Sequence, residues 1–299
     1  MNIIFRKIRS GIWRMLGIDK MQSDLRKEQY LSASLRQEVD TLQYFLNSLN
    51  DVSTLPPTKN LDLRIMQECD ALLLRIFDKI CKKHKITYWL DWGTLLGAVR
   101  HHGFIPWDDD MDISMTRSDY QNLLQVLREE LGDWPFDIKE DVYCLEDSFN
   151  SKAIGLGYRH QQTGVWLDIY ALDEMRTDMP SNAEVKQAME FYSKCGNWDK
   201  VYANGETEYL YLADPYHTYC FRKDSIFPLS TISFEGANYA APNKSESHVA
   251  ECYPDYKSFP KSGVLHHDMG RGNLHTWAKK NGIDMKEVKN ELENIFKSI

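Results

Sequence analysis

The spacing of apolar residues along the chain separates helical from extended segments. A recurrence of apolar side chains every three or four residues predicts amphipathic helices, which we assign to 61–84, 94–100, 116–131 and 284–296. Thr116 and Asp119 resemble a capping box and place the start of the third of these helices. Short apolar runs bounded by turn residues predict strands at 86–91, 109–115, 153–160 and 165–170, and a hairpin over 229–241. Together these elements form a small mixed sheet flanked by helices, which is an α+β fold.

The first 60 residues follow a different pattern and predict an N-terminal helical extension. Residues 1–17 place apolar side chains on one side of a helix and basic residues around it, which is typical of a helix lying in a membrane interface. The alternative is a helix docked on the protein's own core. Residues 21–50 are helical and polar, with a seam of alternating four- and three-residue spacing at Leu35, Val39, Leu42, Leu46 and Leu49. This seam lasts about two heptads, so it fits either self-association as a homo-oligomer or a packed helix hairpin.

Residues 52–60, which contain a Pro-Pro pair at 56–57, are predicted to be a linker, and we place the first domain boundary there. We assign an N-terminal helical segment to 1–58, a catalytic domain to 59–262, and a C-terminal loop and helix to 263–299.

Composition and charge narrow the class of protein. The formal charge of −8 argues against general nucleic-acid binding, which needs a basic face. The six cysteines include no C-x-x-C pair, which suits reduced thiols and disfavours a cysteine zinc site. No apolar run reaches the ~18 to 20 residues that span a bilayer, and basic residues interrupt the N-terminus where a signal peptide would be apolar. We therefore expect a cytoplasmic protein, peripheral on the inner face of the plasma membrane if residues 1–17 bind there.

Four aspartates in five residues are the strongest chemical signal in the chain. On a strand over 109–115, Asp108, Asp110 and Asp112 share one face and Asp109 points to the other. Carboxylates crowded on one face repel one another, and a hard cation with oxygen ligands, such as Mg²⁺ or Mn²⁺, removes that cost. The alternative is a solvated acidic turn, but the apolar residues on both sides of the run disfavour it.

Two further features point to the same site. Asp168 is the lone charged residue of the apolar run 165–170, where it needs a metal or an ion-pair partner, and Arg159 on the neighbouring strand is the alternative partner. The Gly93-Thr94 turn enters a helix, and such a turn can bind phosphate through its N–H groups. Carboxylates, metal and phosphate contact together suit phosphoryl-type transfer from a nucleotide donor.

A long motif around these residues resembles a known family. The string W-G-T-L-L-G-A-V-R-H-H-G-F-I-P-W-D-D-D-M-D-I at 92–113 is similar to the signature of the LicD family of phosphotransferases, which includes the fukutin-related proteins. The strings V-W-L-D-I-Y-A-L-D at 165–173 and I-F-P-L-S-T-I-S-F-E-G-A-N-Y-A-A-P-N at 226–243 also match, so the resemblance covers roughly 62–260.

The resemblance implies a nucleotidyltransferase-like fold and dependence on Mg²⁺ or Mn²⁺. It implies transfer of a substituted phosphate, either phosphocholine or a polyol phosphate, from a CDP-linked donor to a hydroxyl of a cell-surface glycan or glycolipid, as in lipopolysaccharide, capsule or teichoic acid modification. By position, Asp110 and Asp112 are implied metal ligands with Asp108 assisting, and Asp168 is implied as a third ligand or the general base.

The same resemblance implies the donor-binding residues. These are Gly93 and Thr94 against the donor phosphate, Arg100 and His101 close to it, and Trp92 and Trp107 near the chemistry. Trp92 departs from the family pattern, in which glycine is frequent, so this turn is expected to be less open. An aromatic cage for a quaternary ammonium is one interpretation of the tryptophans, and core packing is the other.

Two other functions fit the same residues. A glycosyltransferase can use a D-x-D motif to hold a nucleotide sugar, and it releases a nucleoside diphosphate rather than CMP. A non-catalytic scaffold can use its N-terminal helices to recruit enzymes to a membrane.

Overall fold

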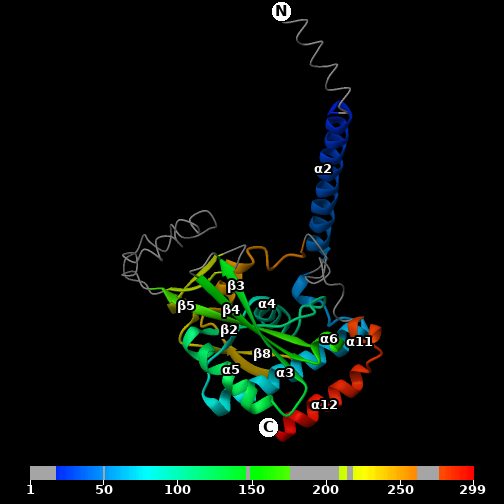
Figure 1. The fold of residues 1–299 in the computed structure, drawn as a ribbon. Helices are drawn as coiled ribbons and strands as arrows, with labels where there is room; N and C mark the ends of the chain where they lie inside the picture. Colours follow the sequence, from blue (N-terminus) through cyan, green and yellow to red (C-terminus); the bar gives the residue numbers. More distant parts are fainter. Residues whose placement is uncertain (1–17, 50, 146–148, 176–208, 214–217, 261–275) are drawn as a thin grey trace, which may run out of the picture. The chain divides into compact units, whose positions relative to one another are not determined.

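The structure is a computed structural model, and it describes residues 18–49, 51–145, 149–175, 209–213, 218–260 and 276–299 (Figure 1). The helix predicted over 1–17 lies outside the described residues. The chain divides into two compact units, one of residues 1–52 with 258–262 and the other of residues 53–257 with 263–299. No helix among the described residues combines the length and the apolar character that crossing a bilayer requires.

The first unit is built on helix α2 (Ile18–Leu49). Its leucine and valine seam lies in the open, with Leu35 52% and Leu42 62% exposed. On another side of the helix, Asn47 accepts a hydrogen bond of 2.9 Å from the main-chain N–H of Phe259. The predicted helical segment is therefore present, and its seam is exposed within this unit.

The second unit contains a mixed sheet, as the sequence predicts (Figure 1). Strand order is β1–β2–β5–β4–β3, with β6 paired to β5 and β7 to β6. The strands are β1 (Trp89–Leu90), β2 (Asp112–Thr116), β3 (Phe136–Leu145), β4 (Phe149–Tyr158), β5 (Trp166–Met175), β6 (Tyr209–Ala213) and β7 (Thr218–Arg222). Among the strands that the structure describes, β2 and β5 run parallel and the other pairs of this sheet are antiparallel. The α+β fold class is confirmed.

Helices cover the sheet because each has one apolar face. Helix α3 (Leu61–His84) buries Leu73, Ile76 and Phe77, packs near β5 and runs beside α12 (Met285–Ser298) (Figure 1). Helix α5 (Arg117–Leu131) packs on β2 and β5, and its N-terminus is capped by the Thr116 hydroxyl, which accepts from the N–H of Asp119. The predicted N-cap at Thr116 is confirmed, and the Asp119 carboxylate accepts from the Thr116 hydroxyl at 3.1 Å.

Shorter elements complete the second unit. Strands β8 (Ser230–Phe234) and β9 (Ala237–Ala241) form the predicted hairpin, and its turn residues Glu235 and Gly236 have φ values of 46° and 75°, as a type I′ turn requires. The short helices of this unit are α4 (Trp92–His101), α6 (His160–Thr163), α9 (Lys223–Ile226), α10 (Ser245–Cys252) and α11 (Trp277–Lys280), and the 3₁₀ helix η1 (Val52–Thr54) spans the boundary between the two units. Helix α10 packs against α4.

Three predicted boundaries are wrong around the acidic run. Strand β1 has two residues instead of six, and α4 begins at Trp92 rather than at 94. The reason is Asp91, whose side chain accepts from the Trp92 N–H and starts the helix early. Strand β2 begins at Asp112 rather than at 109, because a turn in which the Asp108 N–H donates to the carbonyl of Ile105 brings the chain to the sheet as a loop.

Candidate metal and phosphate site

Three carboxylates meet at one edge of the parallel strand pair. Asp112 is the first residue of β2, and it lies directly opposite Asp168 of β5 in the strand register. Asp110 reaches the same place from the loop that precedes β2. Ligand oxygens of the three side chains all lie within 4.8 Å of one another. The structure therefore brings together three of the predicted site residues, although Asp110 comes from a loop rather than from a strand.

Asp108 lies next to this cluster, whereas Asp109 is separate from it. Asp108 and Asp110 interact through a side-chain hydrogen bond, and burial followed by the charge of Asp110 raises the pKa of Asp108 well above its usual value. Asp109 is fully buried and is not one of the clustered carboxylates. Asp109 is therefore separate from the cluster, as expected. The expected reason, alternation along a strand, is wrong, because residues 108–111 lie in the loop before β2.

The cluster fits a hard divalent cation. Asp112 is mostly buried, and burial, then the charges of Asp110 and Asp168, raises its pKa well above 3.8. A cation such as Mg²⁺ or Mn²⁺ takes oxygen ligands and neutralises carboxylates that repel one another. The donor set, three carboxylates at one edge of the parallel strand pair, therefore suits such an ion.

Helix α4 presents its N-terminus to the cluster. The Gly93 N–H donates to Asp112 Oδ2 at 3.2 Å, and the Thr94 hydroxyl accepts from the Asp112 N–H at 2.8 Å. A Cβ on Gly93 would lie 3.1 Å from an oxygen of Asp108 and 3.3 Å from one of Asp112, so this close approach favours glycine. Gly93 thus contacts the Asp112 carboxylate and Thr94 contacts the Asp112 main chain. A phosphate at Gly93 would compete with Asp112 for the N–H.

Trp92 has a strained backbone at the start of α4. Its φ is +46°, in the left-handed region that glycine adopts without cost. Its half-buried ring packs edge-on against Tyr170 of β5 and Phe221 of β7, with both pairs of ring centroids 6.1 Å apart. The departure from the family pattern therefore has a structural consequence, since an aromatic residue occupies a glycine-like conformation beside the cluster.

The residues Asp91 and His248 form a buried ion pair that sequence reasoning missed. His248 of α10 lies 2.8 Å from Asp91 Oδ1, and both side chains are at most 1% exposed. Burial lowers the pKa of His248, but the charge and hydrogen bond of Asp91 outweigh it and raise the pKa above 6.5. Burial raises the pKa of Asp91, but the charge of His248 and hydrogen bonds lower it below 3.8. Asp91 was detectable as an N-cap residue, whereas nothing in the sequence marks His248.

Arg100, His101 and Trp107 form a group beside Asp108. The Arg100 guanidinium donates to the carbonyl of Tyr256 at 2.9 Å and lies 5.8 Å from the Trp107 ring centroid. Burial lowers the pKa of Arg100, and the charge of Asp108 partly offsets this effect. Burial and the charge of Arg100 lower the pKa of His101 to about 4, so its imidazole is neutral at pH 7. These predicted residues therefore provide one positive charge next to the acidic loop.

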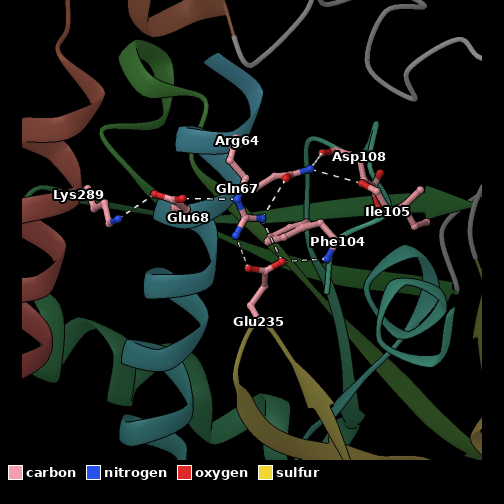
Figure 2. A network of polar contacts seen from close by, with 8 residues as sticks. All are labelled: Arg64, Gln67, Glu68, Phe104, Ile105, Asp108, Glu235 and Lys289. Carbon is pink, nitrogen blue, oxygen red and sulfur yellow. Dashed lines mark hydrogen bonds and ion pairs between the residues drawn. The ribbon is translucent and has the colours of Figure 1, made fainter. Parts of the chain in front are cut away.

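A polar network holds the loop that carries the aspartates (Figure 2). Gln67 of α3 donates to the carbonyl oxygens of Asp108 at 2.9 Å and Ile105 at 3.4 Å. Arg64 forms an ion pair of 2.8 Å with Glu235, whose Oε1 accepts from the N–H of Phe104. The loop is thus held by α3 and by the β8–β9 turn. The apolar spacing of α3 predicted its buried face, but it did not predict these polar contacts.

The alternative partner of Asp168 is occupied elsewhere. Arg159 pairs with Glu291 of α12 at 3.3 Å. Asp168 instead accepts a hydrogen bond of 2.7 Å from the indole N–H of Trp166.

The side chain of Trp89 is fully buried in the core, which agrees with the packing interpretation for that residue.

Comparison with known proteins places this site in a family. The model of the LicD/FKTN/FKRP nucleotidyltransferase domain matches residues 85–244, which is more than half of the chain and includes the whole carboxylate cluster. Lipopolysaccharide cholinephosphotransferase LicD of Haemophilus influenzae is 42% identical over 121 residues, 38% of this chain and 46% of that protein. Human ribitol 5-phosphate transferase FKRP is 45% identical over 97 residues, 28% of this chain and 20% of that protein.

An uncharacterised protein of Rickettsia prowazekii is 47% identical over 62 residues, 20% of this chain and 23% of that protein. Each of these similarities spans less than half the length of the relative. The family match, with its aspartates gathered at one edge of the sheet, shows that the chain belongs to the LicD/FKTN/FKRP nucleotidyltransferase-domain family.

Proposed function

We propose that this chain is a metal-dependent transferase that moves a substituted phosphate from a CDP-linked donor to a hydroxyl of a glycan or glycolipid. The observation that carries the proposal is the convergence of Asp110, Asp112 and Asp168, inside the family match. When bound, Mg²⁺ or Mn²⁺ supplies positive charge to the donor's phosphate oxygens.

The chain's own residues orient the reactants. The acceptor hydroxyl oxygen bonds to the phosphorus that carries the substituent, and the bond from that phosphorus to the bridging oxygen breaks, so CMP leaves. The hydroxyl proton passes to a carboxylate of the cluster. Arg100, beside Asp108, provides a cation for a donor phosphate, and the Gly93 N–H at the N-terminus of α4 provides a hydrogen-bond donor beside Asp112.

The transferred group is proposed to be phosphocholine or a polyol phosphate. One relative is named a cholinephosphotransferase and another a ribitol 5-phosphate transferase, so both groups are represented among the relatives. The aromatic rings of Trp92 and Tyr170 beside the cluster favour phosphocholine, because aromatic faces attract quaternary ammonium groups.

The test is release of CMP by the purified chain with Mn²⁺ and a glycan acceptor, using CDP-choline, CDP-ribitol and CDP-glycerol in parallel. One of these donors should give CMP, and Asp110→Asn should lower the rate by about a hundredfold or more. The matched control is Asp133→Asn, an exposed aspartate outside the cluster, which should keep the wild-type rate. No CMP from any donor would refute the proposal.

The same assay separates the other candidate functions. A glycosyltransferase would release a nucleoside diphosphate from a nucleotide sugar. A scaffold would show no turnover with any donor, and Asp110→Asn would then change nothing.

We further propose two contacts for the N-terminal region. A second copy of α2 would cover the exposed seam, so Leu42→Asp should reduce the mass measured by light scattering if the chain self-associates. Residues 1–17 are proposed to bind the inner face of the plasma membrane, and a chain lacking them should co-sediment less with anionic liposomes.

A further inference from the structure

Two glycines of β4 face two site residues of β5. Trp166 and Asp168 are two residues apart on β5, so their side chains lie on the same face of the sheet. The antiparallel register places Gly157 opposite Trp166 and Gly155 opposite Asp168. A strip of sheet without side chains therefore lies beside the third carboxylate of the cluster.

The indole of Trp166 fills this strip. A Cβ built on Gly155 would lie 1.7 Å from Cζ2 of the indole, and one on Gly157 would lie 2.6 Å from its Cε3. Both distances are far below van der Waals contact, so neither position tolerates a side chain while the indole stays in place. The ring of His160, which is buried, lies close to the indole, with 4.1 Å between the two ring centroids. Packing against the two glycines and His160 therefore holds the indole in one orientation.

That orientation directs the indole N–H at Asp168. The Trp166 Nε1 donates to Asp168 Oδ1 at 2.7 Å, a short distance that is typical of a bond to a charged acceptor. The main chain is fixed at the same residue, because the Trp166 N–H donates to Asp70 Oδ1 of α3 at 3.1 Å. Both ends of Trp166 are thus bound, one to a buried residue of α3 and the other to the carboxylate.

We infer that Trp166 is a positioning residue, which holds Asp168 in the orientation of a metal ligand by way of its indole N–H and the Gly155–Gly157 strip. A hydrogen bond to one oxygen restricts rotation of the carboxylate and leaves the other oxygen directed at the cluster, so the geometry favours Asp168 as a ligand. This inference rests on the proposed metal site and adds a residue to it, since Trp166 contacts neither donor nor acceptor.

The test is the dissociation constant for Mn²⁺, measured by calorimetry without donor or acceptor. Trp166→Phe keeps an aromatic ring in the strip but removes the N–H, and it should weaken Mn²⁺ binding about ten- to a hundredfold. Trp134→Phe is the matched control, because Trp134 is also half-buried and its main chain hydrogen-bonds to Leu131 and Phe136. It should bind Mn²⁺ within about twofold of wild type.

A second measurement on the wild-type chain does not depend on the folding of a variant. Each of the eight tryptophans gives one indole N–H signal in a ¹⁵N spectrum. The assigned Trp166 signal should move when Mg²⁺ saturates the site, and Mn²⁺ should broaden it.

The outcomes separate the inference from the site on which it rests. If wild type binds Mn²⁺ but Trp166→Phe binds it equally well, or the Trp166 signal is unchanged by Mg²⁺, the positioning role is refuted and the metal site stands. If wild type binds no Mn²⁺, both are refuted.

Discussion

Replacing Gln67 by methionine tests whether α3 holds the acidic loop. Gln67 is 1% exposed, and its amide donates to the carbonyl oxygens of Asp108 at 2.9 Å and Ile105 at 3.4 Å (Figure 2). Its Oε1 also accepts from Arg64 at 3.4 Å. Methionine has a similar length and helix propensity, so Gln67→Met removes these polar contacts with little change in packing.

The expected loss follows from the distances. The 2.9 Å bond is the strong one, whereas the two bonds at 3.4 Å are near the limit for a hydrogen bond and contribute little. Leaving the partly buried Asp108 carbonyl without its donor costs about 1–3 kcal/mol in the free energy of unfolding. The loop should also lose order two residues before Asp110, so Mn²⁺ binding should weaken.

Urea unfolding followed by tryptophan fluorescence measures the first effect. The control is Gln125→Met on α5, where an exposed glutamine bonds to Glu129, and its loss should be within about 0.5 kcal/mol. Equal losses for Gln67→Met and Gln125→Met, with Mn²⁺ affinity unchanged in both, would refute the anchoring role of Gln67.

Three further predictions follow from single positions. Because the φ of Trp92 is +46°, Trp92→Gly should be more stable to urea than Trp92→Ala by about 1 kcal/mol, the reverse of the usual order in a helix. Gly97→Ala should lose about 1–3 kcal/mol in the same assay, since its Cβ would lie 2.5 Å from the Gly103 carbonyl oxygen. The pKa of His248 is raised above 6.5 in the folded chain, so its bond to Asp91 stabilises fully below pH 6.5 and is lost as pH rises through the folded pKa. The stability advantage of wild type over His248→Gln should therefore shrink above pH 6.5, and an advantage that grows with pH would contradict this.

Apolar spacing and capping residues predicted the helices whose bounds depend on nearby sequence. The spacing of apolar residues predicted a helix over 61–84, which matches α3, and Thr116 marked the start of α5. The lone carboxylate in the run 165–170 marked Asp168 as a site residue because burying an unpaired charge is costly. Its position opposite Asp112 depends on which strands run parallel, and that is a property of the folded sheet.

The missed residues form contacts between distant parts of the chain. Asp91 and His248 are 157 positions apart, and Arg64 and Glu235 are 171 apart. Gln67 belongs to the polar positions of an amphipathic helix, which usually face water. Such residues are recognisable only when the fold brings a polar group into contact with them. The spacing of residues within one segment therefore cannot predict them.

Each part of the carboxylate cluster has its own support from a different element. Gln67 of α3 fixes the loop that leads to the first carboxylate, and the Thr94 hydroxyl of α4 accepts from the N–H of the second. The third, Asp168, is held by the indole N–H of Trp166 within its own strand. Since these supports are formed by the protein alone, a cation that binds need not order its ligands first, and the cost of bringing the negative charges together is met during folding. It follows that removing one aspartate should stabilise the metal-free chain or leave it unchanged while weakening Mn²⁺ binding, whereas removing a support should weaken both.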